Sequence, residues 1–200
     1  MAVVRLLGEV APDLPDLDAA VLPGPTRQRC VLAALAVDAG RVVSVDRLVE
    51  RVWGLGAERR SRATLQSYVS RLRRVLAGAD DVSIARRSGG YSLLVARPQS
   101  VDLHRFRELC VGARAAADDR QALALLTEAL RLWRGDALTG LTGQWAEAER
   151  DRWRRSVLPR STTSSAPGSG SGRATRATWW SSWRPEPRRT RRTNAWPLST

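Results

Sequence analysis

The chain has 200 residues, which is room for one domain of ordinary size or two small ones, and its 43% hydrophobic and 26% charged residues exclude a wholly disordered protein. Its 33 basic residues outnumber its 20 acidic residues and give a net charge of +13, so a polyanionic partner is the first expectation. Every basic residue is arginine, and the absence of lysine indicates a GC-rich coding sequence that accounts for part of the arginine content.

The cysteines and the hydropathy indicate a cytoplasmic protein without a membrane partner. Cys30 and Cys110 are the only cysteines, and no second cysteine or histidine stands near either at metal-ligand spacing. We therefore expect no metal, no cofactor and no disulfide framework, and we expect both thiols to be small core residues. No apolar run approaches the roughly 18 residues that span a membrane.

The N-terminal part of the chain carries short strand and helix signals. Apolar and turn residues predict a strand over 3–10, a short strand over 19–22, a helix that begins at Pro25 or Thr26 and ends at Gly40, a short strand over 41–43 and a helix over 45–53. Ser44 is expected to cap the second of these helices and Gly54 to end it, because these residue types satisfy helix termini.

The third predicted helix, over 62–76, has two chemically different faces. The residues that recur at steps of four, three and four form one apolar stripe, which consists of Leu65, Val69, Leu72 and Leu76. The rest of the helix surface is polar and basic, and it consists of Thr64, Gln66, Ser67, Ser70, Arg71, Arg73 and Arg74. An amphipathic helix of this kind packs by one face and offers arginine and hydroxyl groups on the other.

A β-hairpin with a basic tip is expected after this helix. Two runs over 82–86 and 91–95 are joined by a Gly-Gly turn, and Arg86 and Arg87 stand at the tip. A helix pair, a helix with an arginine and hydroxyl face and a basic hairpin together form the layout of a winged helix-turn-helix domain, which we assign to residues 1–98.

This layout predicts DNA binding. An α-helix fits the major groove, arginine binds guanine through two parallel hydrogen bonds, and glutamine, serine and threonine read other base edges. The hairpin is expected to reach the flanking backbone or the minor groove. The alternative is that the arginines only solubilise an exposed helix face.

Residues 99–158 indicate an all-α continuation. Three amphipathic helices are predicted over 103–117, 120–134 and 144–158. The middle helix carries apolar residues at helical spacing, which we interpret as a core-packing stripe: Leu123, Leu126, Leu130 and Trp133. His104 is the single histidine, and without a nearby nucleophile or second ligand we assign it to the start of a helix and not to catalysis.

The sequence resembles the Streptomyces antibiotic regulatory protein (SARP) family. Its OmpR-type winged helix is similar to the stretches GPTRQRCVLAALAVDAGRVVSVDRLVERVWG, TLQSYVSRLRRVL and SGGYSLLV. The start of its bacterial transcriptional activation domain is similar to VDLHRFRELCVGARAAADDRQALALLTEALRLWRGDALTGL. The resemblance covers residues 1 to about 158 and implies an α+β winged helix-turn-helix domain followed by an incomplete all-α, tetratricopeptide-like domain.

The resemblance also implies which residues contact DNA. Arg71 and Arg73, in the RLRR run, are expected to read bases in the major groove. The expected contacts to phosphates or groove edges are Trp53, Arg62, Thr64, Tyr68, Ser70 and Arg74. At the wing, Arg87 matches the family's arginine and Arg86 precedes it. Core packing is an equal alternative for Trp53, and the sequence departs from the family at Ser67 and Tyr68, where valine and histidine are common.

The function implied by the resemblance is sequence-specific transcriptional regulation, not enzymatic catalysis. A SARP-like regulator is expected to activate a secondary-metabolite biosynthetic gene cluster, to bind direct repeats in double-stranded promoter DNA of the nucleoid as a homodimer, and to contact the RNA polymerase holoenzyme. The winged helix resembles that of phosphorelay response regulators, but the chain carries no receiver domain. Two alternatives stay open: a truncated regulator that binds DNA without activating, and a helical protein-interaction module with only nonspecific nucleic-acid affinity.

Residues 159–200 differ from the rest of the chain. They hold eight arginines, one acidic residue and four of the eight tryptophans among serine, threonine, proline and glycine, so we expect a disordered tail. The family's activation domain continues through further amphipathic helices, whereas the helical period stops here. One hypothesis is a frameshift near Val157, since shifted frames of GC-rich genes yield this composition; the other is a native basic tail that binds nucleic acid loosely.

Overall fold

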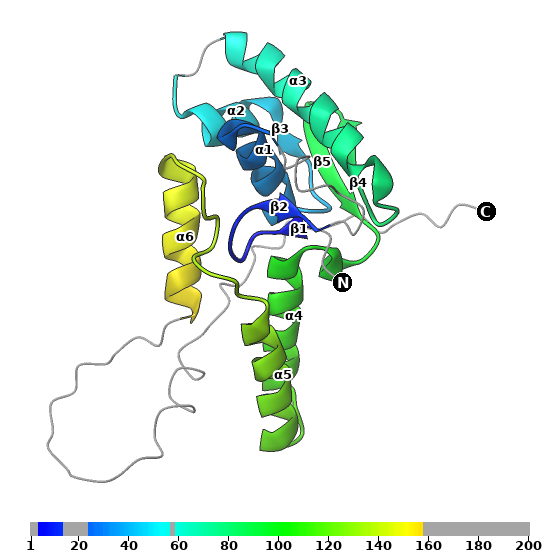
Figure 1. Ribbon diagram of the computed structural model, residues 1–200, viewed down its shortest axis with the longest axis vertical. Coiled ribbons are helices and arrows are strands. Elements are labelled where there is room, and N and C mark those ends of the chain that lie inside the picture. Colours follow the sequence, from blue (N-terminus) through cyan, green and yellow to red (C-terminus); the bar gives the residue numbers. More distant parts are fainter. Residues whose placement is uncertain (1–3, 14–23, 57–58, 158–200) are drawn as a thin grey trace, which may run out of the picture. The chain divides into compact units, whose positions relative to one another are not determined.

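The computed structural model describes residues 4–13, 24–56 and 59–157 (Figure 1). Residues 1–150 form one compact unit, and a second unit begins at Asp151. The predicted winged helix and the helical part that follows it are both present. The strand predicted over 19–22 and the tail over 159–200 lie outside the described residues.

The winged-helix part combines small antiparallel sheets with helices. In chain order its elements are β1 (Val4–Arg5), β2 (Ala11–Pro12), α1 (Thr26–Val37), β3 (Val43–Ser44), α2 (Val45–Trp53), α3 (Arg59–Val75), the 3-10 helix η2 (Leu76–Gly78), β4 (Val82–Arg87) and β5 (Gly90–Val95). β1 pairs with β2, and the other strands have the order β3-β5-β4. In Figure 1, α3 lies beside the β4–β5 hairpin.

The ends of α2 confirm the predicted helix. The Oγ atom of Ser44 accepts a hydrogen bond from the Arg47 N–H at 3.2 Å, and Gly54 follows the last residue with a φ of +89°. The neighbouring helices differ from the prediction only at their ends, since α1 stops at Val37 and α3 already begins at Arg59.

The strand predicted over 3–10 is wrong over most of its length. Val4–Arg5 is the named strand of this segment and pairs with β2, and Glu9 forms only an isolated bridge with Thr139. The chain then bends, and Gly8 has a φ of +146°, a backbone conformation that residues with a Cβ rarely adopt. The apolar residues of this segment are buried nevertheless, because they pack against the helical part of the same unit.

The core of the winged helix lies between α1, α3 and the hairpin. Residues 30–37 of α1 are all buried, and the four residues of the predicted α3 stripe are each at most 2% exposed, which confirms that stripe. Burial of one such leucine or valine side chain contributes roughly 1.5–3 kcal/mol. The apolar face of α3 is therefore fixed to the core, and its polar face is left to the outside.

The helical part consists of the 3-10 helix η3 (Pro98–Ser100), α4 (Asp102–Arg114), α5 (Asp119–Arg131) and α6 (Gln144–Val157). α4 and α5 pack side by side (Figure 1). The rings of Phe106 and Trp133 meet edge to face at 5.6 Å, and Arg105 forms an ion pair with Glu128. No helix within the described ranges has the length and apolarity that a membrane span requires.

The core-packing stripe predicted for α5 is wrong in part. Leu123 and Leu130 are each 48% exposed, whereas Ala129 is 1% exposed and Trp133 packs against Phe106. The reason is that α5 turns the face carrying Ala129 and Glu128 toward α4, so the leucines on the other face have no helix over them within the described residues.

A short N-terminal segment connects the winged helix to the helical part. The N–H groups of Leu6 and Leu7 donate to the two carboxylate oxygens of Asp102, at 2.8 and 3.0 Å. On the other side of the segment, the N–H groups of Leu138 and Arg134 donate to the carbonyl oxygens of Leu6 and Leu7, at 2.9 and 2.8 Å. The backbone of this segment is thus satisfied largely by the helical part.

Asp102 is the buried acid of this connection. Its residue is 1% exposed, and burial raises the pKa of the carboxyl from 3.8 to about 6, although the hydrogen bonds from Leu7 and Leu6 act in the opposite direction. The two cysteines are buried as predicted, and burial raises the pKa of the Cys30 thiol to about 12 and of the Cys110 thiol to about 11.

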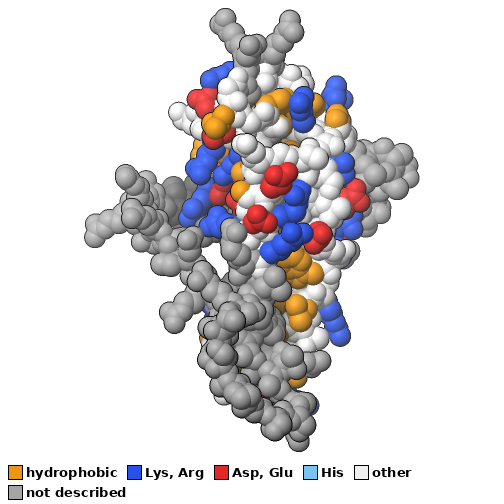
Figure 2. Space-filling view, turned by 90° about the vertical axis from the view of Figure 1, so that its left-hand side faces the viewer, with side chains coloured by type: hydrophobic (Ala, Val, Ile, Leu, Met, Phe, Trp, Pro, Cys, Tyr) orange, Lys and Arg blue, Asp and Glu red, His pale blue; other side chains and the backbone are white. Residues whose placement is uncertain are grey.

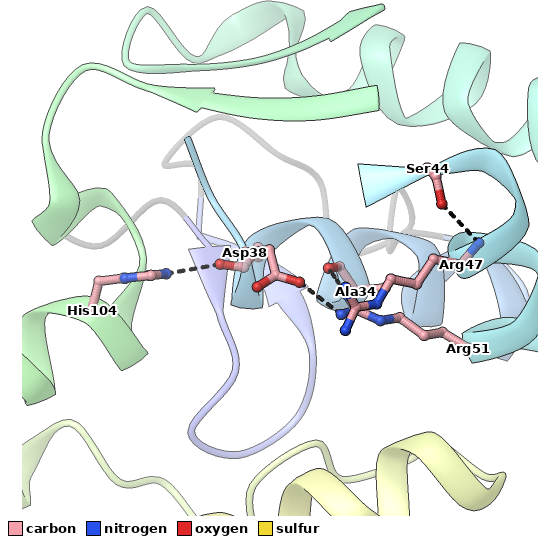
Figure 3. A network of polar contacts seen from close by, with 7 residues as sticks. Ala34, Asp38, Ser44, Arg47, Arg51 and His104 are labelled. Carbon is pink, nitrogen blue, oxygen red and sulfur yellow. Dashed lines mark hydrogen bonds and ion pairs between the residues drawn. The ribbon is translucent and has the colours of Figure 1, made fainter. Parts of the chain in front are cut away.

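A second connection satisfies the C-terminal end of α1 (Figure 3). His104, in the first turn of α4, donates Nε2 to the carbonyl oxygen of Ala36 at 2.9 Å. From α2, Arg51 donates Nη1 to the carbonyl oxygen of Ala34 at 2.9 Å and pairs with Asp38 at 2.7 Å. The last carbonyl groups of a helix lack intrahelical partners and carry partial negative charge, so an arginine is favourable here.

Candidate nucleic-acid interface

The exposed face of α3 is the centre of the candidate interface. Apart from Ala63, its exposed described side chains are polar or basic, and they stand on the side away from the buried stripe of the same helix. These polar and basic members are Arg62, Gln66, Ser67, Ser70, Arg71, Arg73 and Arg74. No acidic residue occurs between Arg59 and Val75, so the charge of this face is uniformly positive.

The two arginines predicted to read bases have different surroundings. The Nε atom of Arg73 donates to the backbone carbonyl of Ile84 in β4 at 2.8 Å, which connects α3 to the wing. Both terminal amino groups of Arg73 remain without a partner among the described residues, and so does the whole guanidinium of Arg71. The hydrogen bond therefore orients the guanidinium of Arg73, whereas no contact among the described residues restrains the side chain of Arg71.

At the start of α3, the predicted phosphate contacts touch α2. Arg62 forms an ion pair with Asp46, and both side chains are largely exposed. The ring of Tyr68 is stacked on that of Trp53, with centroids 6.1 Å apart and planes 5° from parallel. The side chain of Thr64 is half-buried, and that of Ser70 is exposed. The rings of Trp53 and Tyr68 thus pack α2 against α3, and both side chains remain partly accessible to solvent.

The wing differs from the prediction in where its arginines stand. Arg86 and Arg87 are the last residues of β4, and the tip is formed by Ser88 and Gly89. Arg86 lies opposite Tyr91, donates to its hydroxyl at 2.9 Å and lies over its ring at 5.4 Å. Arg87 is exposed and has no partner among the residues that the structure describes.

A glycine beside the tip of the wing allows close contact with the start of α2. A Cβ built on Gly90 would lie 2.1 Å from the carbonyl oxygen of Val43, so only glycine fits where β5 pairs with β3. The Val45 N–H donates to the carbonyl oxygen of Gly89 at 3.1 Å. The wing and the first residue of α2 therefore hold one another in place.

The face drawn in Figure 2 carries both signs of charge. Figure 2 shows the side that lies on the left in Figure 1, and acidic side chains stand there among the arginines. The uniformly basic character of α3 is therefore a local feature and not a consequence of the arginine-rich composition alone.

Comparison with known proteins identifies the same two parts. Regulatory protein AfsR of Streptomyces coelicolor is 36% identical over 141 residues, which are 68% of this chain and 14% of AfsR. Transcriptional regulator RedD of the same organism is 38% identical over 144 residues, which are 68% of this chain and 40% of RedD. The family "Transcriptional regulatory protein, C terminal" matches residues 20–93, and the family "Bacterial transcriptional activator domain" matches residues 101–179.

The chain belongs to the SARP family. The first match contains α1 to α3, β4, the first four residues of β5 and all ten residues expected to contact DNA. The second contains α4, α5 and α6 and continues past the predicted domain end at residue 158 into residues that the structure does not describe.

A solved structure has the same fold as this SARP chain. It is titled "Mycobacterium tuberculosis EmbR in complex with low affinity phosphopeptide", has a TM-score of 0.66 and 33% sequence identity, and is covered over 41% of its length by 76% of this chain. The SARP chain thus spans less than half the length of the relatives AfsR, RedD and EmbR.

Three partners in the SARP interface were not found from the sequence. Asp46 as the partner of Arg62 and the carbonyl of Ile84 as the partner of Arg73 are tertiary contacts with no local signal. The contact of Arg86 with Tyr91 had a signal, because a hairpin with a two-residue turn places these positions opposite each other.

Proposed function

We propose that the chain is a sequence-specific DNA-binding transcriptional regulator that acts as an activator. α3 enters the major groove, where Arg71 and Arg73 read bases. Phosphates or groove edges are contacted by six further residues, which are Trp53, Arg62, Thr64, Tyr68, Ser70 and Arg74. In the wing, Arg86 and Arg87 contact the flanking DNA. The observation that carries the proposal is the acid-free face of α3, on which Arg71 has no partner among the described residues and Arg73 is oriented by the Ile84 carbonyl.

The finer parts of the proposal rest on the family. As for a SARP regulator, we infer binding to direct repeats near a promoter, pairing of two chains on DNA, contact of the helical part with the RNA polymerase holoenzyme, and control of a biosynthetic gene cluster. The names of AfsR and RedD support regulation of transcription as the general role. We keep residues 1–98 and 99–158 as the proposed DNA-binding and activation parts.

The test is DNA binding by the full chain. Promoter fragments of the neighbouring genes and scrambled DNA are titrated across a salt series and followed by fluorescence anisotropy. R71A is expected to weaken binding to the specific fragment by about 1–3 kcal/mol and to leave binding to scrambled DNA nearly unchanged. A phosphate contact such as Arg87 is expected instead to lower the salt dependence by about one unit of slope when it is changed to alanine.

R120A is the matched control, because it removes one exposed arginine from α5 and leaves α3 intact. Equal losses on both DNAs in R71A would demote Arg71 to a phosphate contact. An equal loss in R120A would mean that general positive charge, and not the α3 face, is responsible, as the alternative of a helical interaction module with nonspecific affinity predicts.

A further inference from the structure

The outward face of α5 has an apolar stripe bounded by arginines. We call it the α5 surface, and it consists of Arg120, Leu123, Ala124, Thr127, Leu130 and Arg131. From Arg120 the positions 123/124, 127 and 130/131 recur every three to four residues, which places these side chains on one side of the helix. Leu123 and Leu130 are each 48% exposed, and the described residues that line a shallow open hollow on this side all belong to α5.

The charges at the α5 surface are positive and available. Arg120 and Arg131 are exposed and have no ion-pair or hydrogen-bond partner within the described residues. Glu128, the acidic residue that lines this hollow, is already paired with Arg105 of α4. Eleven residues separate the two arginines, which corresponds to about 16 Å along the helix axis, with both leucines in between.

We propose that the α5 surface binds an acidic amphipathic helix of the transcription machinery, and this inference rests on the proposed function. Leucines of the bound helix lie on Leu123 and Leu130, and its carboxylates, about three helical turns apart, meet Arg120 and Arg131. An amphipathic helix seated in an apolar groove, with complementary charges at the rim, is a recurring way to recognise a partner.

Charge argues against other occupants of this surface. Residues 159–200 of the same chain hold eight arginines and one acidic residue, so they would meet Arg120 and Arg131 with like charge. A second copy of α5 would bring the same two arginines. A nucleic acid would place phosphates against the two half-exposed leucines, which offer them no hydrogen bonds.

The experiment uses the full chain and two labelled helical peptides. One peptide carries leucines at helical spacing with flanking glutamates, and the other has each glutamate replaced by lysine. By anisotropy, the wild-type chain is expected to bind the acidic peptide about tenfold more tightly than the basic one, and L123S/L130S to lose about tenfold in that affinity. R120E/R131E is expected to reverse the preference between the peptides.

Purified bacterial RNA polymerase holoenzyme provides the second readout. The wild-type chain is expected to retain the polymerase on a column, L123S/L130S to lose this retention, and the acidic peptide to compete for it. V111S is the matched control, because Val111 is 54% exposed but lies on α4. Helicity by circular dichroism checks that the variants are folded.

Several results would overturn the inference. These are equal binding of both peptides, an effect of V111S as large as that of L123S/L130S, polymerase retention that L123S/L130S leaves unchanged, displacement of the peptide by scrambled DNA, or a dimer that L123S/L130S dissociates.

DNA binding separates this inference from the proposed function. L123S/L130S is expected to keep specific DNA binding, and R71A is expected to lose specific DNA binding but to keep peptide binding. If no variant binds promoter DNA specifically, the proposed function fails, while the peptide preference still reports on the α5 surface.

Discussion

The buried carboxylate of Asp102 predicts a pH dependence of stability that one substitution isolates. In the folded chain the pKa of Asp102 is raised to about 6 from its ordinary 3.8, chiefly because burial penalises the charged form. Between these two values the folded state holds more protons than the unfolded state. By linkage, the contribution of this group to stability falls as pH rises from about 4 to about 6 and then stays constant.

The size of the effect follows from the shift. A rise from 3.8 to about 6 corresponds to about 3 kcal/mol between the acidic and neutral limits. The residue is 1% exposed, so no reduction for solvent screening applies. About 2 kcal/mol of the change falls between pH 4.5 and 7.5, and the remaining roughly 1 kcal/mol falls below pH 4.5, where the carboxyl of the unfolded state titrates.

D102N removes the titration and keeps the shape of the side chain. Urea unfolding of wild type and D102N is measured from pH 4.5 to 7.5 at one ionic strength. In the difference between their free energies of unfolding, the pH dependence of the titratable groups that both proteins share cancels. The stability of wild type relative to D102N is expected to fall by about 2 kcal/mol over this range. Parallel curves, or a difference that changes in the opposite direction, would refute the raised pKa of Asp102.

Two further substitutions test the wing. G90A is expected to destabilise the chain by at least about 1–3 kcal/mol in urea unfolding, because the new Cβ would lie 2.1 Å from the Val43 carbonyl oxygen; wild-type stability would show that β3 does not pair there. Y91F removes the hydroxyl that accepts from Arg86, and we expect a loss of about 0.5–1.5 kcal/mol in stability and weaker DNA binding through the wing; unchanged salt dependence and affinity would contradict a role of Arg86 in DNA contact.

Local signals explain most of what the sequence predicted correctly. Ser44 and Gly54 mark the ends of α2 by their own backbone chemistry, and the glycines at 89 and 90 predicted the β4–β5 hairpin, whose turn is Ser88-Gly89. The apolar stripe of α3 predicts both its buried face and, by subtraction, the exposed face proposed to bind DNA.

Long-range contacts explain the errors. The strand predicted over 3–10 failed because Leu6 and Leu7 bond to Asp102, Leu138 and Arg134, which lie about a hundred residues away in sequence. Periodicity also identified the leucines of α5 as one face without indicating whether that face is covered, since the same spacing suits a core and a docking surface.

The N-terminal segment makes the winged helix dependent on the helical part. In a fragment that ends at residue 98, the N–H groups of Leu6 and Leu7 would lose the carboxylate of Asp102, and their carbonyl groups would lose the N–H groups that now donate to them. Water would replace these partners, so the main cost is the exposure of Leu6 and Leu7, which are at most 1% exposed in the full chain and whose burial contributes roughly 1.5–3 kcal/mol each. The C-terminal end of α1 would also lose His104. The α3 face and the α5 surface therefore belong to one compact unit, in which the N-terminal segment and His104 connect the winged helix to the helical part.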